Sequence, residues 1–207
     1  MPDFHALVPH PATPAPMVRA VDASVVLADG GIAFHYRLRG DMARLRMPEA
    51  RVPERRDSLW EHTCFEAFVG LEGHTVYREF NFSPSGQWAA YDFGDYRRRL
   101  DDPALAAPRI STRSTEGRLE LEAWLPLSSL PSIAGAVWEI GLAAVVEAAD
   151  TVNDGLSYWA LRHPAPRPDF HLRDGFALRH PPIHPEESGL APCTAFGHLL
   201  PPREKGR

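Results

Sequence analysis

TCFEAFVGLEGHTVYREFNFSPSGQWAAYDF, residues 63–93, holds three seven-residue runs rich in aromatic and β-branched side chains. The runs cover 63–69, 76–82 and 87–93, and turns that contain Gly or Pro separate them. Short strands that recur about every 8–12 residues with such turns are typical of antiparallel β-proteins. The segment therefore predicts a three-stranded antiparallel meander.

Further strand-like runs lie on both sides of this meander. The first two, 21–27 and 32–38, are joined by Asp29-Gly30-Gly31, a turn of the kind that closes a β-hairpin. Later runs cover 118–125, 137–146 and 157–161, and a short helical turn is expected at 127–130. We predict an all-β fold, a two-sheet antiparallel β-sandwich of jelly-roll or immunoglobulin-like topology, with long proline-rich loops and at most short helices.

Proline is the unusual feature of the composition. The chain has 207 residues, which fits one domain, and 21 of them are proline, about twice the usual share of ~5%. Proline is excluded from helix interiors and from central strands, so proline-rich segments should be extended. We expect an extended arm at 1–19, regular structure from near Val21, a β-sandwich domain at 20–180 and a proline-rich tail at 181–207.

Charge and cysteine content exclude several classes of protein. The net charge is −5, whereas a binder of nucleic acid or of an anionic membrane needs a basic surface, so neither partner is expected. Cys64 and Cys193 have no CxxC spacing, which argues against zinc fingers, iron–sulfur sites and disulfide frameworks. Neither a signal-like start nor an apolar run of about 18 residues is present. We expect a cytoplasmic protein, and the sequence does not fix its oligomeric state.

Period-2 alternation divides the meander into two faces. Within each strand one face carries, in turn, Phe65, Ala67 and Val69, then Arg78, Phe80 and Phe82, and then Trp88, Ala90 and Asp92. If the strands align, the other face brings Glu66 together with Glu79 and Asn81, beside tyrosines. A surface of carboxylates, amides and aromatic rings suits sugar hydroxyls and pyranose faces. The simpler interpretation, which the pattern alone favours, is that these polar side chains wet the outer face of an antiparallel sheet.

Titratable side chains in the loops raise two other hypotheses. A metal site could be built from His62, His163, Asp169 and His171. No HExxH spacing or CxxC partner supports it, so structural histidines are the favoured interpretation. Glu61 and Glu66 could act as the acid and base of a glycosidase, but residues five apart at the start of one strand face opposite ways. We therefore assign no catalytic residue.

Several of these segments resemble one family. The matching segments are LWEHTCFE (59–66), YREFNFSP (77–84) with Trp88 and Tyr91, SYWAL (157–161), PDFH (168–171) and His10-Pro11. They are similar to a bacterial subgroup of DOMON-like domains, which are akin to family 9 carbohydrate-binding modules. The resemblance covers roughly His10 to Leu178.

The resemblance implies a β-sandwich that binds sugars or haem. Sugar-binding relatives hold the saccharide between aromatic rings, with polar side chains around it; the eligible residues here are Trp60, Glu66, Glu79, Asn81, Trp88, Trp159 and Arg162. Haem-binding relatives use axial Met and His ligands, for which Met42, Met47, His62 and His163 are eligible. We predict a non-enzymatic domain that binds a carbohydrate or related polyol and needs no cofactor. A domain that holds haem or a structural metal ion, and an interaction subunit without a small ligand, are the alternatives.

Overall fold

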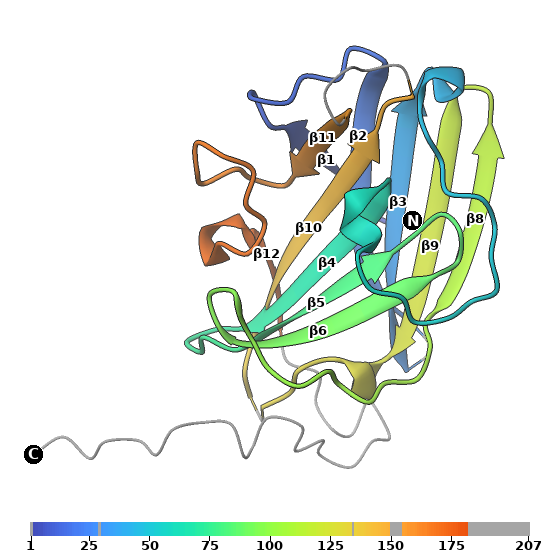
Figure 1. Cartoon of the computed structure of the whole chain (residues 1–207). Coiled ribbons are helices and arrows are strands. Elements are labelled where there is room, and N and C mark those ends of the chain that lie inside the picture. Colours follow the sequence, from blue (N-terminus) through green and yellow to red (C-terminus); the bar gives the residue numbers. More distant parts are fainter. Residues whose placement is uncertain (1, 29, 134, 150–154, 182–207) are drawn as a thin grey trace, which may run out of the picture.

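Strand pairing follows one continuous path that bends into two facing sheets (Figure 1). The computed structural model describes residues 2–28, 30–133, 135–149 and 155–181. The first sheet has the order β1 (His5–Pro9), β2 (Val18–Ala28), β3 (Gly31–Gly40), β9 (Arg118–Pro126) and β8 (Arg109–Thr115). The second has the order β7 (Arg98–Arg99), β6 (Trp88–Asp95), β5 (Tyr77–Phe82), β4 (Cys64–Leu71), β10 (Trp138–Glu147) and β11 (Leu156–Ala160), and β12 (Leu178–His180) also pairs with β10.

The architecture confirms the predicted all-β sandwich. All pairs between the named strands are antiparallel, and the hairpin predicted around Gly30 is formed by β2 and β3. Helical structure in the described residues is limited to the 3-10 turns η1 (Met42–Arg44), η2 (Leu59–Glu61), η3 (Leu127–Ser129) and η4 (Arg173–Gly175). Within the same residues, none of the helices has the length and apolar character that crossing a membrane requires.

The N-terminal segment corrects one expectation. Regular structure begins at His5 rather than near Val21, because β1 pairs with β2 through Leu7 and Val21 and with β11 through Val8 and Ala160. This short strand therefore joins the two sheets instead of forming a separate arm. The alternation of so short a strand is hard to recognise among prolines. The expected C-terminal tail lies, beyond Pro181, outside the described residues.

The core between the sheets confirms the predicted faces of the meander. Phe34 and Tyr36 of β3 pack against Phe65, Phe80 and Phe82 from β4 and β5, and all five side chains are fully or almost fully buried. On the same inner face, the guanidinium of Arg78 donates to both carboxylate oxygens of Asp92. Side chains of opposite parity therefore point away from this core.

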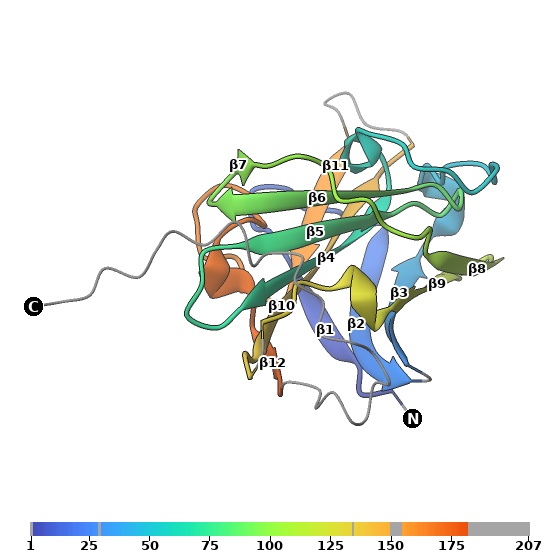
Figure 2. The ribbon, with the colours of Figure 1, turned by 90° about the horizontal axis from the view of Figure 1, so that it is seen from below.

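The outer face of the second sheet is covered by other parts of the chain, so the simpler interpretation of wetted polar side chains is wrong. The segment 161–177, which joins β11 to β12, and the turn η2 lie against this face (Figures 1 and 2). Phe68, Tyr77 and Phe93 form a second apolar cluster there with Phe176 from the covering segment. All residues of β4 and β5 are buried as a result.

Strand β8 could not be recognised from alternation of apolar and polar residues. Its sequence RISTRST has no apolar face, and its residues are mostly exposed because it is the edge strand of the first sheet. Pairing with β9, and not burial of its own side chains, holds it in place.

Candidate functional site

A pocket of about 360 Å³ opens on the covered outer face of the second sheet. It is lined by Trp60, Glu66, Glu79, Tyr91, Phe93, Arg97, Arg99, Val145, Tyr158, Pro168, Asp169, Phe170 and His171. Strands supply the floor, whereas η2, the β6–β7 turn and the segment 161–177 supply the walls. An open pocket with aromatic lining and a few converging titratable groups is the usual form of a small-molecule site.

The floor of the pocket carries two glutamates on neighbouring strands. Glu66 of β4 lies opposite Asn81 of β5, and Phe68 lies opposite Glu79. Glu66 and Glu79 are therefore diagonal neighbours on one face, a relation in which side chains about 7 Å apart can reach each other. Both residues are buried, with exposed fractions of 3% and 5%.

Glu66 has unused hydrogen-bonding capacity. In the part of the chain that the structure describes, no group donates a hydrogen bond to its carboxyl. Burial raises the pKa of Glu66 and the neighbouring Glu79 carboxyl raises it further, although the positive charge of Arg97 opposes the rise. Because this carboxyl lines the pocket and can still accept hydrogen bonds, it is a candidate for contact with a ligand.

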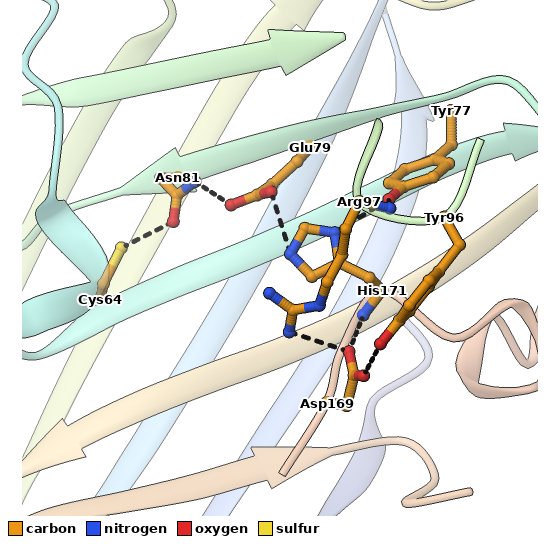
Figure 3. A network of polar contacts seen from close by, with 8 residues as sticks. All are labelled: Cys64, Tyr77, Glu79, Asn81, Tyr96, Arg97, Asp169 and His171. Atoms are coloured by element: carbon orange, nitrogen blue, oxygen red, sulfur yellow. Dashed lines mark hydrogen bonds and ion pairs between the residues drawn. The ribbon is translucent and has the colours of Figure 1, made fainter. Parts of the chain in front are cut away.

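Glu79 is held in place by its neighbours (Figure 3). The side-chain amide of Asn81 donates to its Oε1 at 2.6 Å, and the thiol of Cys64 donates to Asn81 Oδ1 at 3.5 Å. Burial raises the pKa of Glu79 to about 7, although the Asn81 hydrogen bond and the nearby Arg97 and Arg99 oppose the rise. This carboxyl consequently changes its charge close to neutral pH.

His171 reaches the pocket from the covering segment and faces Glu79. Its Nδ1 lies 2.9 Å from the hydroxyl of Tyr77, which also accepts the backbone N–H of Arg97 at 3.2 Å. The hydroxyl proton is therefore free to be donated to Nδ1, which leaves the ring proton on Nε2. Burial lowers the pKa of His171 to about 4, and Arg97 lowers it as well. His171 is thus a neutral N–H donor at neutral pH.

Asp169 fastens the covering segment to the β6–β7 turn (Figure 3). Its carboxylate accepts hydrogen bonds from the Tyr96 hydroxyl at 2.5 Å, from Arg97 Nη2 at 3.1 Å and from the backbone N–H of His171 at 3.1 Å. Burial by itself raises the pKa of Asp169, but these three donors lower it below the usual value. Arg97 adopts a left-handed backbone conformation with φ of 52°, which costs energy in a residue other than glycine. The hydrogen bond from the Arg97 side chain to Asp169 holds the turn in this conformation, at the point where the turn contacts the covering segment.

Trp60 forms part of the rim. Its indole is 37% exposed and meets the ring of Tyr91 edge to face, with centroids 5.7 Å apart. The other side of the rim is Arg99, whose guanidinium lies 4.1 Å from the centroid of Tyr91 and pairs with Asp102 at 2.7 Å. An accessible indole beside fixed polar groups can stack on an apolar ligand face.

The structure brings four of the seven proposed ligand residues together and separates the other three. Trp60, Glu66 and Glu79 line the pocket, and Asn81 lies beneath Glu79. Trp88 and Trp159 do not line this pocket but belong to the core between the sheets, with exposed fractions of 6% and 5%, and Trp159 also borders a separate pocket beside β1 and β2. Arg162 is exposed and does not line the pocket.

The residues proposed for a metal or for haem do not gather. His62 pairs with Glu147 at 2.8 Å, whereas His163 Nε2 lies 2.8 Å from the carbonyl of Val8. Asp169 and His171 do line the pocket, but no group of three candidate metal ligands exists among the described residues. Met42 and Met47 pack against the main core, on the other side of the sheet from the pocket. Cys193 lies outside the described residues.

Several lining residues were missed by the sequence-based selection. Tyr91 and Phe93 share the face of Glu79 by period-2 parity, so the strand pattern contained the signal for them. Arg97, Arg99 and Phe170 lie in a turn, a two-residue strand and a loop, where no periodicity applies. Their positions follow from tertiary contacts alone.

Comparison with known proteins supports the fold. No family model and no curated protein matches the sequence. A solved structure from Bacteroides uniformis, described as a candidate carbohydrate-binding protein, has a TM-score of 0.61 and 20% identity and covers 84% of each chain. A family 9 carbohydrate-binding module from Caldicellulosiruptor kristjanssonii in complex with cellotriose has a TM-score of 0.48 and 9% identity and covers 77% of this chain and 72% of the module. The chain shares the fold of the Bacteroides uniformis protein, whereas the resemblance to DOMON-like domains and to family 9 carbohydrate-binding modules stays a prediction.

Proposed function

We propose that this pocket binds a carbohydrate or a related polyol and that the protein is a binding domain without catalytic activity. The observation that carries the proposal is the Glu66 carboxyl, which is buried and without a hydrogen-bond donor among the described residues, in the same pocket as the accessible Trp60 indole. The Glu66 carboxyl needs a polar partner, and the Trp60 indole needs an apolar one. A sugar ring offers both on a single molecule.

The chemistry of the lining suits hydroxyl groups. Each sugar hydroxyl can donate one hydrogen bond and accept others. A carboxyl whose pKa is raised by burial, as in Glu66 and Glu79, can donate when protonated and accept when ionised. The aromatic rings of Trp60 and Tyr158 add apolar surface to the same pocket. The description of the Bacteroides uniformis neighbour as a candidate carbohydrate-binding protein agrees with this proposal.

Calorimetric titration with a panel of mono- and oligosaccharides tests the proposal. We expect at least one saccharide to bind, and Trp60→Ala to weaken its binding about tenfold, because a stacked aromatic ring contributes about 1 kcal/mol or more. Val52→Ala is the matched control, since Val52 is 76% exposed and does not line the pocket. Absence of binding across the whole panel would refute the function, and equal affinities of the wild type and Trp60→Ala would refute the site.

A further inference from the structure

The ionised groups around the pocket are unevenly paired. The two guanidinium groups of the lining already have carboxylate partners: Arg97 pairs with Asp169 at 3.1 Å, and Arg99 pairs with Asp102 at 2.7 Å. The cations of the walls are therefore neutralised by the protein itself.

The two carboxyls of the floor have no such partner. Among the described residues, neither Glu66 nor Glu79 lies within ion-pair distance of an arginine or lysine. The basic side chain that does approach is His171, whose Nε2 is 3.7 Å from Glu79 Oε2, and it is neutral at neutral pH because burial lowers its pKa to about 4. Buried carboxylates are normally paired with a cation. Without such a partner both carboxyls hold protons more readily than exposed glutamates, and a bound cation would allow them to ionise.

We infer that the pocket selects saccharides that carry a free amino group, and that the ammonium of such an amino sugar lies between the carboxyls of Glu66 and Glu79. The inference rests on the proposed function and narrows its ligand class. An ammonium has three N–H donors and no acceptor, which matches two acceptors that converge from neighbouring strands. Aromatic rings attract ammonium groups, and those of Trp60, Phe93 and Phe170 line the same pocket.

Neutral and acidic sugars should interact less favourably with the carboxyls of Glu66 and Glu79. A neutral sugar offers hydroxyl donors but no positive charge, so it gains no charge-assisted hydrogen bond from ionised carboxyls. An acidic sugar would require Arg97 or Arg99 to leave Asp169 or Asp102 and would add a further negative charge beside Glu66 and Glu79. The ranking expected from this arrangement is amino sugar, then neutral sugar, then acidic sugar.

Binding of an ammonium should also expel protons. In the empty pocket both glutamates hold protons more readily than exposed glutamates, because burial raises their pKa values. Other titratable or charged groups on the elements packed around the pair are Tyr36, Cys64, Tyr77, Tyr91, Arg97, Arg99, Asp169 and His171. Of these, His171 changes charge near pH 4 and Tyr77 near pH 12, and burial raises the pKa values of Tyr36, Cys64 and Tyr91. Proton release near pH 6.5 therefore reports on Glu66 and Glu79.

The test compares glucose, glucuronate and the three deoxyglucoses that bear an amino group at C2, C3 or C6. By calorimetry at pH 6.5, we expect one amino sugar to bind at least about tenfold more tightly than glucose, as one charge-assisted hydrogen bond would provide. Titration in two buffers of different ionisation enthalpy should show proton release with that amino sugar and none with glucose. Glucose binding without any gain from an amino group, or tightest binding of glucuronate, would overturn the inference and leave the proposed function standing. Absence of all sugar binding would overturn both.

Two variants test whether the preference for amino sugars depends on the Glu66 carboxyl. Glu66→Gln should reduce the ratio of amino-sugar affinity to glucose affinity to about one, because the amide cannot carry the negative charge. Glu116→Gln is the matched control, since Glu116 is exposed in the turn between β8 and β9 of the other sheet and is outside the lining, and its ratio should equal that of the wild type. A thermal unfolding curve establishes that Glu66→Gln is folded. Proton release by the wild type provides an independent readout if the variant is not folded, and an unchanged ratio in folded Glu66→Gln would overturn the assignment.

Discussion

The Nε2 atom of His171 lies 3.7 Å from Oε2 of Glu79, and this contact joins the covering segment to the sheet without forming an ion pair. The Tyr77 hydroxyl fixes the ring by hydrogen bonding to Nδ1, so Nε2–H faces the carboxylate. Asn81 donates to the other oxygen of Glu79. Glu79 therefore receives oriented dipoles, whereas Glu66 beside it receives none from the described residues. The two carboxyls of the pocket floor therefore differ: Glu79 already has hydrogen-bond donors, whereas Glu66 has none among the described residues.

The pH dependence of stability should report on Glu79. Its pKa rises from 4.5 to about 7 on folding, so the folded state binds more protons than the unfolded state between these values. Stability from this group is present below pH 4.5 and is lost as pH rises through 7. Glu79→Gln removes this loss and keeps an acceptor for Asn81. We expect the variant to exceed the wild type in free energy of unfolding by about 1–3 kcal/mol at pH 8, measured by urea denaturation. Parallel pH profiles of the two proteins would contradict the buried position of this carboxyl.

His171 should stay neutral down to about pH 4. NMR titration of its ring should give a midpoint near that value, with the signal assigned by its absence in His171→Gln. The sign of the linked stability is opposite to that of Glu79. Between pH 4 and 6.5 the unfolded state binds the extra proton, so this group's contribution to stability rises with pH. Arg97→Ala should raise the midpoint while burial keeps it below 6.5. A wild-type midpoint near 6.5 would show that the segment does not cover the histidine.

The buried ion pair between Arg78 and Asp92 should be sensitive to loss of one partner. Arg78 donates to both Asp92 oxygens, at 2.5 and 2.7 Å, and also to the Ser129 carbonyl at 2.5 Å. Arg78→Met would leave a buried carboxylate unpaired, and we expect it to lower the free energy of unfolding by about 3–5 kcal/mol. The double variant Arg78→Met/Asp92→Leu should recover most of this loss. Chemical denaturation measures both, and additive losses in the double variant would argue against a coupled pair.

Particular residues show how far the sequence predicts this site. Period-2 parity placed Glu66, Glu79 and Asn81 on one face correctly, because side chains on paired strands must alternate. Parity also put Trp88 on one face with Ala90, and the structure places that face in the core between the sheets. The walls were not predictable in this way. Arg97 and Asp169 come from a turn and a loop that are 72 residues apart, and nothing local in the sequence indicates that they meet.

The contact between Asp169 and the β6–β7 turn should control how firmly the pocket is covered. Asp169 accepts hydrogen bonds from Tyr96 and Arg97 across the gap between two segments, and it also binds the backbone of His171. Asp169→Ala removes all three contacts, so the covering segment should open more often while the core between the sheets remains intact. Hydrogen exchange of backbone amides in 165–176 should accelerate at least about tenfold, since loss of charge-assisted hydrogen bonds amounts to 1.4 kcal/mol or more.

A second variant separates this effect from general destabilisation. Tyr96→Phe removes one hydrogen bond from a half-exposed residue and leaves Arg97 bound to Asp169, so exchange in the segment should change less than threefold, because exposed polar contacts contribute little. Amides of β3, which lies in the other sheet, should be unaffected in both variants. If exchange accelerated equally in β3 and in 165–176 of Asp169→Ala, the carboxylate would support the whole fold and not the cover of the pocket. Asp169→Ala also leaves Arg97 without its carboxylate partner. The unpaired positive charge beside the pocket should weaken any preference of the pocket for an ammonium group over a neutral hydroxyl.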